Sequence, residues 1–599
     1  MKKSSGRKRP AAKKPGACPF FSHSLLPSLT VFGLSAESGH DRSSRSRKSL
    51  NPLSEAVEAR EATLCESEGQ AHTDRVVIAG GDDDSDQEGG DEEDPFAFTE
   101  VDPPHAGPAP AVPLDFKVPD HDHPERPFLP PRRLRPEPMS GSAPVDFFDR
   151  LIRPAFFDRM YLETRRHWEE PRDKLRHPIE REPAPDADEL RTFIGLLFHI
   201  SVKTGPTRHF WSEDSPLFDP MVANTMSRDR FMAIWIHLHF NDNHAEKRMV
   251  DGEPDKLHKI RPLLEEILSN CRRLHYPGKF IVFDESMIAY RGHNKMRQYV
   301  PGKPTPNGYK ALIGADPVDG YVIEIKFYTG KKAVPEHDLG MKIVLALGDP
   351  YLDCGHCFMG DSYFSSVDLC NALDARGTDY IGSFDPRRRG FPKDKLIVKD
   401  LPQWGHQTHT ADNKIFITGF NGPKRTHIIS TGGSVLQTVN MKFPHGETHA
   451  VPEVVRTYWT NYGAVDFHDE LRSYYPLKKK SKRYYTPLVL YLFDVARVNG
   501  YIDYLRDSPE NIRAPSLLDF TMGLARGLIG GRCYRQRGRY YTISSMDLHE
   551  RVPLGPKRKC CVRGCESKIP NGCRQCKKYL CPHHFAEHQA EQLRASSCI

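Results

Sequence analysis

The sequence predicts an α/β core between helical segments, followed by a cysteine-rich C-terminal module. Residues 280–287, FIVFDESM, begin with apolar residues and lack polar alternation, which is typical of a strand covered on both faces. Strand-like and helix-like runs then alternate as far as residues 378–384, TDYIGSF. The last 40 residues hold seven of the 14 cysteines. Together these observations indicate a chain of several domains.

The composition is that of a chain with at least one substantial core. Of the 599 residues, 38% are hydrophobic. We expect no membrane span, because no run approaches about eighteen consecutive apolar residues. We also expect no secretion, since the N-terminal residues lack a convincing cleavage site. Two basic clusters, Arg7–Arg9 and Lys13–Lys14, resemble a nuclear localisation signal and predict a nuclear protein.

Charge is distributed unevenly along the chain. Residues 80–94, GGDDDSDQEGGDEED, are nearly all acid and glycine, yet the net charge is +6. The excess of positive charge elsewhere suggests a polyanionic partner. Residues 1–138 are rich in proline, serine, glycine and charged residues, so we expect a disordered N-terminal arm. Within it, Ser85 is a hypothetical phosphorylation site that intact-mass measurement tests.

Apolar residues at helical spacing mark the segments on either side of the core. Helices are expected in residues 146–168 and 189–202, and Ser227 is expected to cap a third. Thr486 and Pro487 are expected to start a later helix. The apolar stripe of this helix, like the others, is interpreted as core and consists of Leu488, Tyr491, Leu492, Val495, Val498 and Ile502.

The central segment predicts a specific order of elements. Residues 280–287 and two runs within residues 309–330, joined by a turn at Pro317–Gly320, give three successive antiparallel strands. The further elements are a helix in 338–352, a strand in 357–366, a helix in 367–377 and a strand in 378–384. The order β-β-β-α-β-α-β matches a ribonuclease-H-like core. In that topology the first and fourth strands are neighbours.

Acids follow two of these apolar strands at corresponding places. Asp284 is expected to end the first strand and Asp361 the fourth, so that their carboxylates meet at one rim. Asp466 is a third candidate, with Asp469 one helical turn later on the same face. A lone acid in this setting more often caps a turn or pairs with a base. Several together repel one another unless cations lie between them, and oxygen ligands favour Mg²⁺ or Mn²⁺.

Four stretches resemble the piggyBac transposases and their domesticated relatives. They are RFMAIWIHLHFNDN, the run from FIVFDESM to IKFYTG, the run from MGDSYFSS to YIGSF, and the run from TNYGAVDFHD to VARVNGY. The resemblance implies a DDD-type nuclease and strand transferase that binds double-stranded DNA. Such an enzyme excises an element through hairpin intermediates and inserts it at TTAA. The resemblance also implies a homodimer that brings two transposon ends together.

The family's functional acids can be assigned residue by residue. Its three metal-binding aspartates fall on Asp284, Asp361 and Asp466, and its nearby fourth acid falls on Asp469. The usual GGVD motif reads GAVD here through Ala464, and His468 occupies a variable position. All four acids are present, which is compatible with catalysis.

The resemblance also implies the domain organisation. A ribonuclease-H-like catalytic core with an insertion domain is expected to be flanked by a mainly α-helical dimerisation and DNA-binding domain. We expect the helical domain in residues 145–278 and 473–548, the catalytic domain in 279–385 and 451–472, the insertion in 386–450, and the cysteine-rich domain in 557–599, after the disordered arm in 1–138. A basic strip is interpreted as contacting DNA phosphates, with a solvated face as the alternative: Lys478, Lys479, Lys480, Lys482 and Arg483.

Cysteine and histidine spacing predicts zinc at the C terminus. The spacings C-x3-C, C-x2-C and C-x2-H suit interleaved tetrahedral sites of RING or PHD type. The expected ligands are Cys561, Cys565, Cys573, Cys576, Cys581, His584 and His588, with Cys598 as a possible eighth. Cys560 and His583 are neighbours that could replace them. Disulfides are disfavoured in a nuclear protein. The preceding Lys557, Arg558 and Lys559 could contact DNA.

Another cysteine pair has a different interpretation. Cys354 and Cys357 have the spacing of a disulfide-isomerase active site, but no thioredoxin-like pattern surrounds them. We interpret them as two cysteines at a strand edge.

Three functions are consistent with these features. The first is an active transposase, in which two metal ions about 4 Å apart activate a water or 3′-hydroxyl and stabilise the leaving oxygen of a phosphodiester. The second is a domesticated DNA- or chromatin-binding protein that retains the fold without using the chemistry. In the third, the zinc module reads histone tails or recruits a ubiquitin-conjugating partner.

Overall fold

The structure is a computed structural model, and it describes most of the chain from Phe116 onward. The described ranges are 116–129, 142–170, 182–330, 338–508, 515–533, 541–542 and 551–588, except for 125, 246, 251–252, 302, 444–445, 479–480, 482, 563–564, 574–575, 583 and 586–587. Among these residues, no helix is both long and apolar enough to cross a bilayer. Ser85, the acidic stretch and the basic N-terminal clusters lie outside the described residues.

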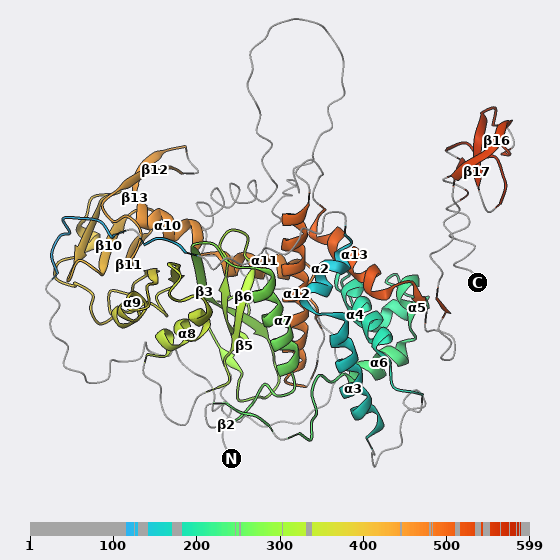
Figure 1. Cartoon of the computed structure of the whole chain (residues 1–599), viewed down its shortest axis with the longest axis horizontal. Coiled ribbons are helices and arrows are strands. Elements are labelled where there is room, and N and C mark those ends of the chain that lie inside the picture. Colours follow the sequence, from blue (N-terminus) through green and yellow to red (C-terminus); the bar gives the residue numbers. More distant parts are fainter. Residues whose placement is uncertain are drawn as a thin grey trace, which may run out of the picture. The chain divides into compact units, whose positions relative to one another are not determined.

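A mixed nine-stranded sheet forms the α/β core (Figure 1). The strand order is β4-β5-β3-β7-β8-β11-β10-β9, with β6 paired to β5. The strands are β3 (Phe280–Ala289), β4 (Gln298–Tyr299), β5 (Asn307–Ala315), β6 (Val322–Phe327), β7 (Cys357–Gly360), β8 (Asp379–Ser383), β9 (His406–Thr410), β10 (Phe416–Asn421) and β11 (Arg425–Ser430).

The pairing within this sheet confirms the predicted strand arrangement. β3, β5 and β6 are antiparallel in sequence order. β7 then pairs in parallel with β3, so the first and fourth predicted strands are neighbours. A parallel pair requires a crossover connection, and here it includes helix α8 (Leu339–Gly348) and the short η3 (Asp349–Tyr351). Helix α9 (Val367–Asp374) connects β7 with the parallel β8.

The first strand is longer than expected. Asp284 was expected to end it, but β3 continues to Ala289, paired with β5 as far as Gly308. Glu285 can stay within the strand because Lys310, on the adjacent β5, forms an ion pair with its carboxylate. The pairing of β3 with β7 does end here: its last pair is Phe283 with Gly360, directly before Asp284.

Helices from both ends of the described chain pack together. α12 packs on α2 and α7, and α13 packs on α4 and α2. As predicted, Ser227 caps α6 by accepting a hydrogen bond from the Arg230 backbone N–H, and α12 begins at Thr486. The helices are α2 (Pro144–Leu151), α3 (Pro154–Glu169), α4 (Ala187–Ser201), η2 (Thr207–Trp211), α5 (Pro220–Thr225), α6 (Arg228–His237), α7 (Arg261–Leu274), α12 (Thr486–Asp507) and α13 (Leu517–Ile529).

The segment expected as an insertion contributes to the main sheet. Its strands β9, β10 and β11 extend the sheet through antiparallel pairing of β11 with β8. A separate hairpin, β12 (Thr438–Lys442) and β13 (Thr448–Pro452), leads into α10 (Glu453–Asn461) and α11 (Ala464–Tyr474).

The remaining elements are η4 (Val398–Asp400), β1 (Met249–Val250), β2 (Glu253–Pro254), β14 (Arg532–Cys533), β15 (Tyr541–Thr542), β16 (Arg551–Lys559) and β17 (Lys568–Cys573). The domain boundaries stay predictions.

Residues 116–129, here called the N-terminal strap, correct the expectation of disorder throughout residues 1–138. Phe116 is buried in the core, and Lys117 pairs with Thr410 at the end of β9. Asp122 accepts hydrogen bonds from the Val435 and Leu436 backbone N–H groups at 2.6 and 3.0 Å. Proline-rich composition suggested disorder, but these anchors act singly and need no regular secondary structure.

Arg126 closes the strap against the core. Its guanidinium donates to Asp379 at 2.7 Å and also pairs with Asp374. We expect Arg126→Ala to lower the free energy of unfolding by about 1–2 kcal/mol, because the Asp379 carboxylate would remain buried without its partner. Urea unfolding and limited proteolysis of the strap would measure this. The matched control is Lys117→Ala, whose exposed side chain leaves the backbone bridge intact. Equal stability of the two variants would contradict the expectation.

Candidate active site and metal-binding groups

Asp284 on β3 and Asp361, which directly follows the parallel neighbour β7, lie at corresponding positions. The register pairs Phe283 with Gly360, so the residue that follows each member of this pair is one of the two aspartates. Adjacent strands are about 4.8 Å apart, which brings both carboxylates to one place. Asp361 Oδ1 accepts a hydrogen bond from the Tyr363 backbone N–H at 2.9 Å, and this turn fixes its direction.

Helix α11 brings the other two predicted acids to the same strand. α11 packs against β3, and the Ser286 hydroxyl on β3 donates to Asp469 Oδ1 at 2.9 Å. Arg472, one turn further along α11, also donates to that oxygen, at 3.1 Å. Asp469 is therefore held between strand and helix. Asp466, one turn earlier, is exposed.

The acids influence one another electrostatically. Burial, together with the negative charges of Asp361 and Asp466, raises the pKa of Asp284 to about 7. Burial and the nearby Glu285 also raise the pKa of Asp361. In the absence of a cation, the cluster therefore retains a proton near neutral pH. A divalent cation would favour the fully ionised form.

The donor set of this cluster fits a hard divalent ion. Asp284, Asp361 and Asp466 offer only carboxylate oxygens, the ligands that Mg²⁺ and Mn²⁺ prefer. Among the residues that the structure describes, they do not form a group with all ligand atoms within 4.8 Å.

Two lysines near the acids were missed by the sequence interpretation. Lys310 on β5 pairs with Glu285, and its ammonium lies 4.4 Å from the ring centroid of Tyr363. Lys303 Nζ, from the turn between β4 and β5, lies 3.7 Å from Glu285 Oε1. For Lys303, the only sequence signal was its place in the proline-rich stretch PGKPTP, and this stretch does not show which groups the lysine faces.

A tight turn positions the helix that carries Asp466 and Asp469. The His468 ring donates from Nδ1 to the Gly320 carbonyl at 3.0 Å, and burial lowers the pKa of His468 to about 3, so the ring is neutral. Gly320 has a φ of +74°, and a Cβ there would lie 2.9 Å from Phe467 and 3.1 Å from the Ala464 carbonyl. Glycine is therefore required both by the backbone and by the close approach of α11.

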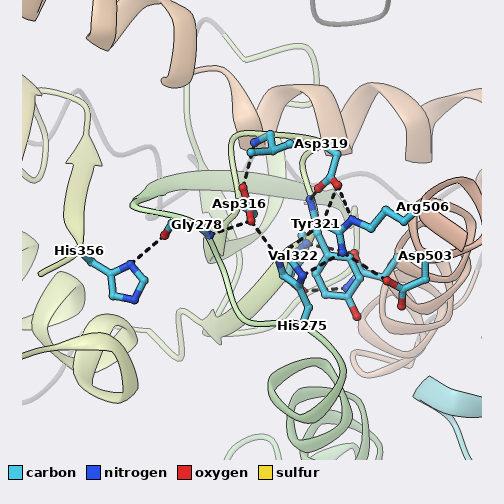
Figure 2. A network of polar contacts seen from close by, with 11 residues as sticks. His275, Gly278, Asp316, Asp319, Tyr321, Val322, His356, Asp503 and Arg506 are labelled. Atoms are coloured by element: carbon cyan, nitrogen blue, oxygen red, sulfur yellow. Dashed lines mark hydrogen bonds and ion pairs between the residues drawn. The ribbon is translucent and has the colours of Figure 1, made fainter. Parts of the chain in front are cut away.

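A network of polar side chains fixes the same turn from the other side (Figure 2). Arg506 of α12 donates to Asp319 at 2.7 Å and to His275 Nδ1 at 2.9 Å. His275 in turn donates from Nε2 to Asp316 at 2.8 Å, while Asp316 accepts from the Gly278 backbone N–H at 3.3 Å. Arg506 of α12 and His275, which follows α7, thus hold the turn against which α11 packs.

We expect Gly320→Ala to impair catalysis by displacing α11. A displacement of about 1 Å can cost about 10²-fold in rate. Gly446→Ala is the control, because Gly446 has a similar φ of +85° but a Cβ added there would meet no atom within 4 Å. Both variants share the backbone strain, so urea unfolding and rates of DNA cleavage should differ only through α11. Equal losses in both would show that the close approach is unimportant.

Cysteines and histidines form two groups in the C-terminal module. Cys560, Cys565, Cys581 and His584 have their ligand atoms within 4.8 Å of one another, as do Cys573, Cys576 and His588. Along the chain, two ligands of the first group are followed by two of the second, then by two of the first and one of the second. This is the interleaved arrangement that the spacing favours. The four-residue group suits a closed tetrahedral zinc site. The buried apolar residues and cysteines of the described part of the module are Cys560, Cys573, Leu580, Cys581 and Phe585, and His588 is buried as well.

The structure groups Cys560 where the sequence interpretation expected Cys561. The Cys560 side chain is buried, whereas Cys561 is exposed and belongs to neither group. The Cys560 backbone N–H donates to the Ser567 carbonyl, and the Cys561 backbone N–H donates to the Tyr579 carbonyl. Because these bonds run in different directions, the two successive side chains point apart. Cys598 and His583 lie outside the described residues.

Cys357 behaves as a structural cysteine. It is the buried first residue of β7, and burial raises its thiol pKa well above the usual value. A reactive thiol requires the opposite shift, which favours a structural role for Cys357.

The comparison with protein families decides the identity of this chain. A family model described as "Transposase IS4" matches residues 143–501 of the 599, more than half of the chain and all four acids. The chain belongs to the piggyBac-type transposase family. This family member is 24% identical over 333 residues to human "PiggyBac transposable element-derived protein 3", covering 53% of this chain and 54% of that protein.

Other relatives agree with the assignment. Human "PiggyBac transposable element-derived protein 2" is 28% identical over 335 residues, covering 53% of this chain and 55% of that protein. The chain thus spans about half the length of the curated relatives that it matches. A cryo-EM structure of a piggyBac transposase synaptic complex with hairpin DNA aligns with a TM-score of 0.58 at 21% identity, over 74% of this chain and 95% of that one. At this identity, the likeness shows the fold.

The predicted DNA-contacting residues of this transposase family member are only partly described. Lys478 is exposed, and Arg483 donates to the Tyr485 hydroxyl at 3.2 Å. Lys557, Arg558 and Lys559 are exposed along β16, with Arg558 lying 5.6 Å from the ring centroid of Tyr579. Lys479, Lys480 and Lys482 lie outside the described residues. Their role in DNA binding stays a prediction.

Proposed function

We propose that the protein is a DDD-type DNA transposase that binds transposon ends, cleaves DNA and joins it to TTAA sites with the aid of divalent metal ions. The observation that carries this proposal is the convergence of Asp284, Asp361 and α11 at the place where pairing between β3 and β7 ends. The raised pKa of Asp284 is the electrostatic mark of that convergence.

The four acids divide between two tasks in this mechanism. Asp284 and Asp361, fixed by strand and turn, and Asp466, presented by α11, would hold Mg²⁺ or Mn²⁺. When bound, such ions activate a water or 3′-hydroxyl and stabilise the leaving oxygen. Asp469 is bound to Ser286 and Arg472, so its task is to orient α11 against β3. Rigid elements hold these side chains more firmly than loops could.

The proposal extends to partners, zinc and location. We propose zinc ions in the two C-terminal groups, where the module would help to bind transposon ends, and a homodimer that pairs two ends. We also propose a nuclear location, for which the support is the basic clusters Arg7–Arg9 and Lys13–Lys14. The solved relative is described as a synaptic complex with hairpin DNA, which supports the choice of DNA as partner and of hairpins as products.

A cleavage assay tests this function directly. Purified protein is incubated with Mg²⁺ and labelled DNA that carries the element's own flanking ends beside TTAA, and products are mapped on a denaturing gel. Cleavage beside TTAA with hairpin products is the expected result. Binding of the ends without cleavage, under conditions where a control transposase cuts, would contradict the proposal.

The second candidate is a domesticated DNA- or chromatin-binding protein. It is favoured by one observation, namely that two human relatives are named as proteins derived from transposable elements. The same assay separates the candidates, because this one predicts binding of the ends without cleavage.

A further inference from the structure

The turn between β4 and β5 brings a loosely held lysine to the acid cluster, here defined as Asp284, Glu285, Asp361 and Asp466. This turn is closed by a hydrogen bond from the Val300 backbone N–H to the Pro306 carbonyl at 2.8 Å, with Lys303 near its tip. The Lys303 side chain is 31% exposed, and its ammonium is 3.7 Å from Glu285 Oε1. This separation is longer than that of a direct hydrogen bond.

Glu285 already has a closer partner. Lys310, whose side chain is only 11% exposed, pairs with Glu285 and packs over Tyr363, the residue whose backbone N–H holds Asp361. Lys310 is therefore a fixed part of the sheet. Glu285 consequently does not require Lys303, and the position of Lys303 needs another explanation.

Lys303 lies in the field of four of the acids around the site. Burial disfavours its charge, but Asp284, Glu285, Asp466 and Asp361 together outweigh burial and raise its pKa. These groups come from β3, from the residue after β7 and from α11, while the neighbouring positive charge is Lys310 of β5. The cluster therefore holds four carboxylates against two ammonium groups, of which only Lys303 is loosely held.

We propose that Lys303 is the exchangeable counter-ion of the acid cluster, neutralising the carboxylates when no divalent ion is bound and giving way when one binds. This inference rests on the proposed metal-dependent function. The lysine and the divalent ion compete for the same negative charge, so removing the lysine charge strengthens binding of the ion. A like charge within a few ångströms of an incoming cation opposes its binding, with an expected effect of about tenfold in affinity.

Direct measurement of Mn²⁺ binding tests the competition. Isothermal titration of the zinc-loaded protein compares wild type with Lys303→Met and Lys303→Arg. Lys326→Met is a matched control, since Lys326 is exposed on β6. An Asp361→Asn background identifies binding elsewhere on the chain. We expect Lys303→Met to lower the Kd for Mn²⁺ about tenfold, while Lys303→Arg and Lys326→Met leave it unchanged.

Thermal unfolding separates this role from a merely structural one. Without metal, Lys303→Met should melt at a lower temperature than wild type, because the carboxylates lose a counter-ion, and it should gain more from added Mn²⁺. A structural role alone would lower the melting temperature without changing the Kd. An unchanged or higher Kd in Lys303→Met overturns the inference. Absence of Mn²⁺ binding at Asp361 in both wild type and Lys303→Met would instead contradict the proposed metal-dependent function itself.

Discussion

Replacing Asp361 with asparagine is expected to abolish DNA cleavage while leaving DNA binding intact. Asparagine retains an oxygen that can accept the hydrogen bond from the Tyr363 backbone N–H, so the turn after β7 persists. It removes the negative charge that would hold a divalent ion beside Asp284. We expect the cleavage rate to fall by about 10³-fold or more, equivalent to about 4 kcal/mol of transition-state stabilisation.

The chain contains a matched control for this substitution. Asp385 follows the neighbouring strand β8, and its Oδ1 accepts from the Arg387 backbone N–H at 2.8 Å in the same type of turn. Asp385→Asn should therefore retain cleavage, while Asp361→Asn loses it, with end binding by fluorescence anisotropy equal in both. Cleavage by Asp361→Asn at the wild-type rate would refute the metal assignment. Loss of DNA binding would indicate a folding defect instead.

Adjacent cysteines provide the second large expected effect. Cys560→Ser should release the metal of the four-residue group, whereas Cys561→Ser should retain it, because only Cys560 belongs to that group. Structural zinc contributes about 10–16 kcal/mol in comparable small modules. The module buries few apolar side chains, chiefly Leu580 and Phe585, so it should unfold without zinc.

Zinc content and DNA binding measure this effect separately. Zinc released on thiol modification, counted with a colorimetric chelator, should fall in Cys560→Ser only. Proteolysis of the module should become faster in the same variant, and affinity for transposon ends should weaken. Loss of zinc in Cys561→Ser, or equal zinc in both variants, would contradict the ligand assignment. Unchanged end binding after verified loss of zinc would mean that the module serves another purpose.

Elements with strong local patterns were predicted correctly from the sequence. Asp284 and Asp361 each follow apolar strand residues, and the order of strands and helices predicted that these strands would be neighbours. The Ser227 cap and the start of α12 at Thr486 followed from short-range rules. These features depend on residues close together in sequence, or on topology that few arrangements satisfy.

Features that depend on distant partners could not be predicted. β3 was expected to end at Asp284, but it continues beyond it. The continuation could not be foreseen, because Glu285 pairs with Lys310, which lies 25 residues later on a strand whose register the sequence does not specify. The strap was missed because Asp122 and Arg126 find their partners more than 240 residues away. Cys560 and Cys561 differ only in the direction of their side chains, which spacing does not reveal.

The strap also affects the free edge of the large sheet. β9 is the last strand in that sheet, and an uncovered last strand offers unpaired backbone groups to another chain. Lys117 exchanges two backbone hydrogen bonds with Thr410, at 2.7 and 2.8 Å, and so occupies one end of that strand. A recombinant chain that began at Val145 would leave these groups open. Self-association through β9 would then become a hazard that the full chain limits by covering its own edge.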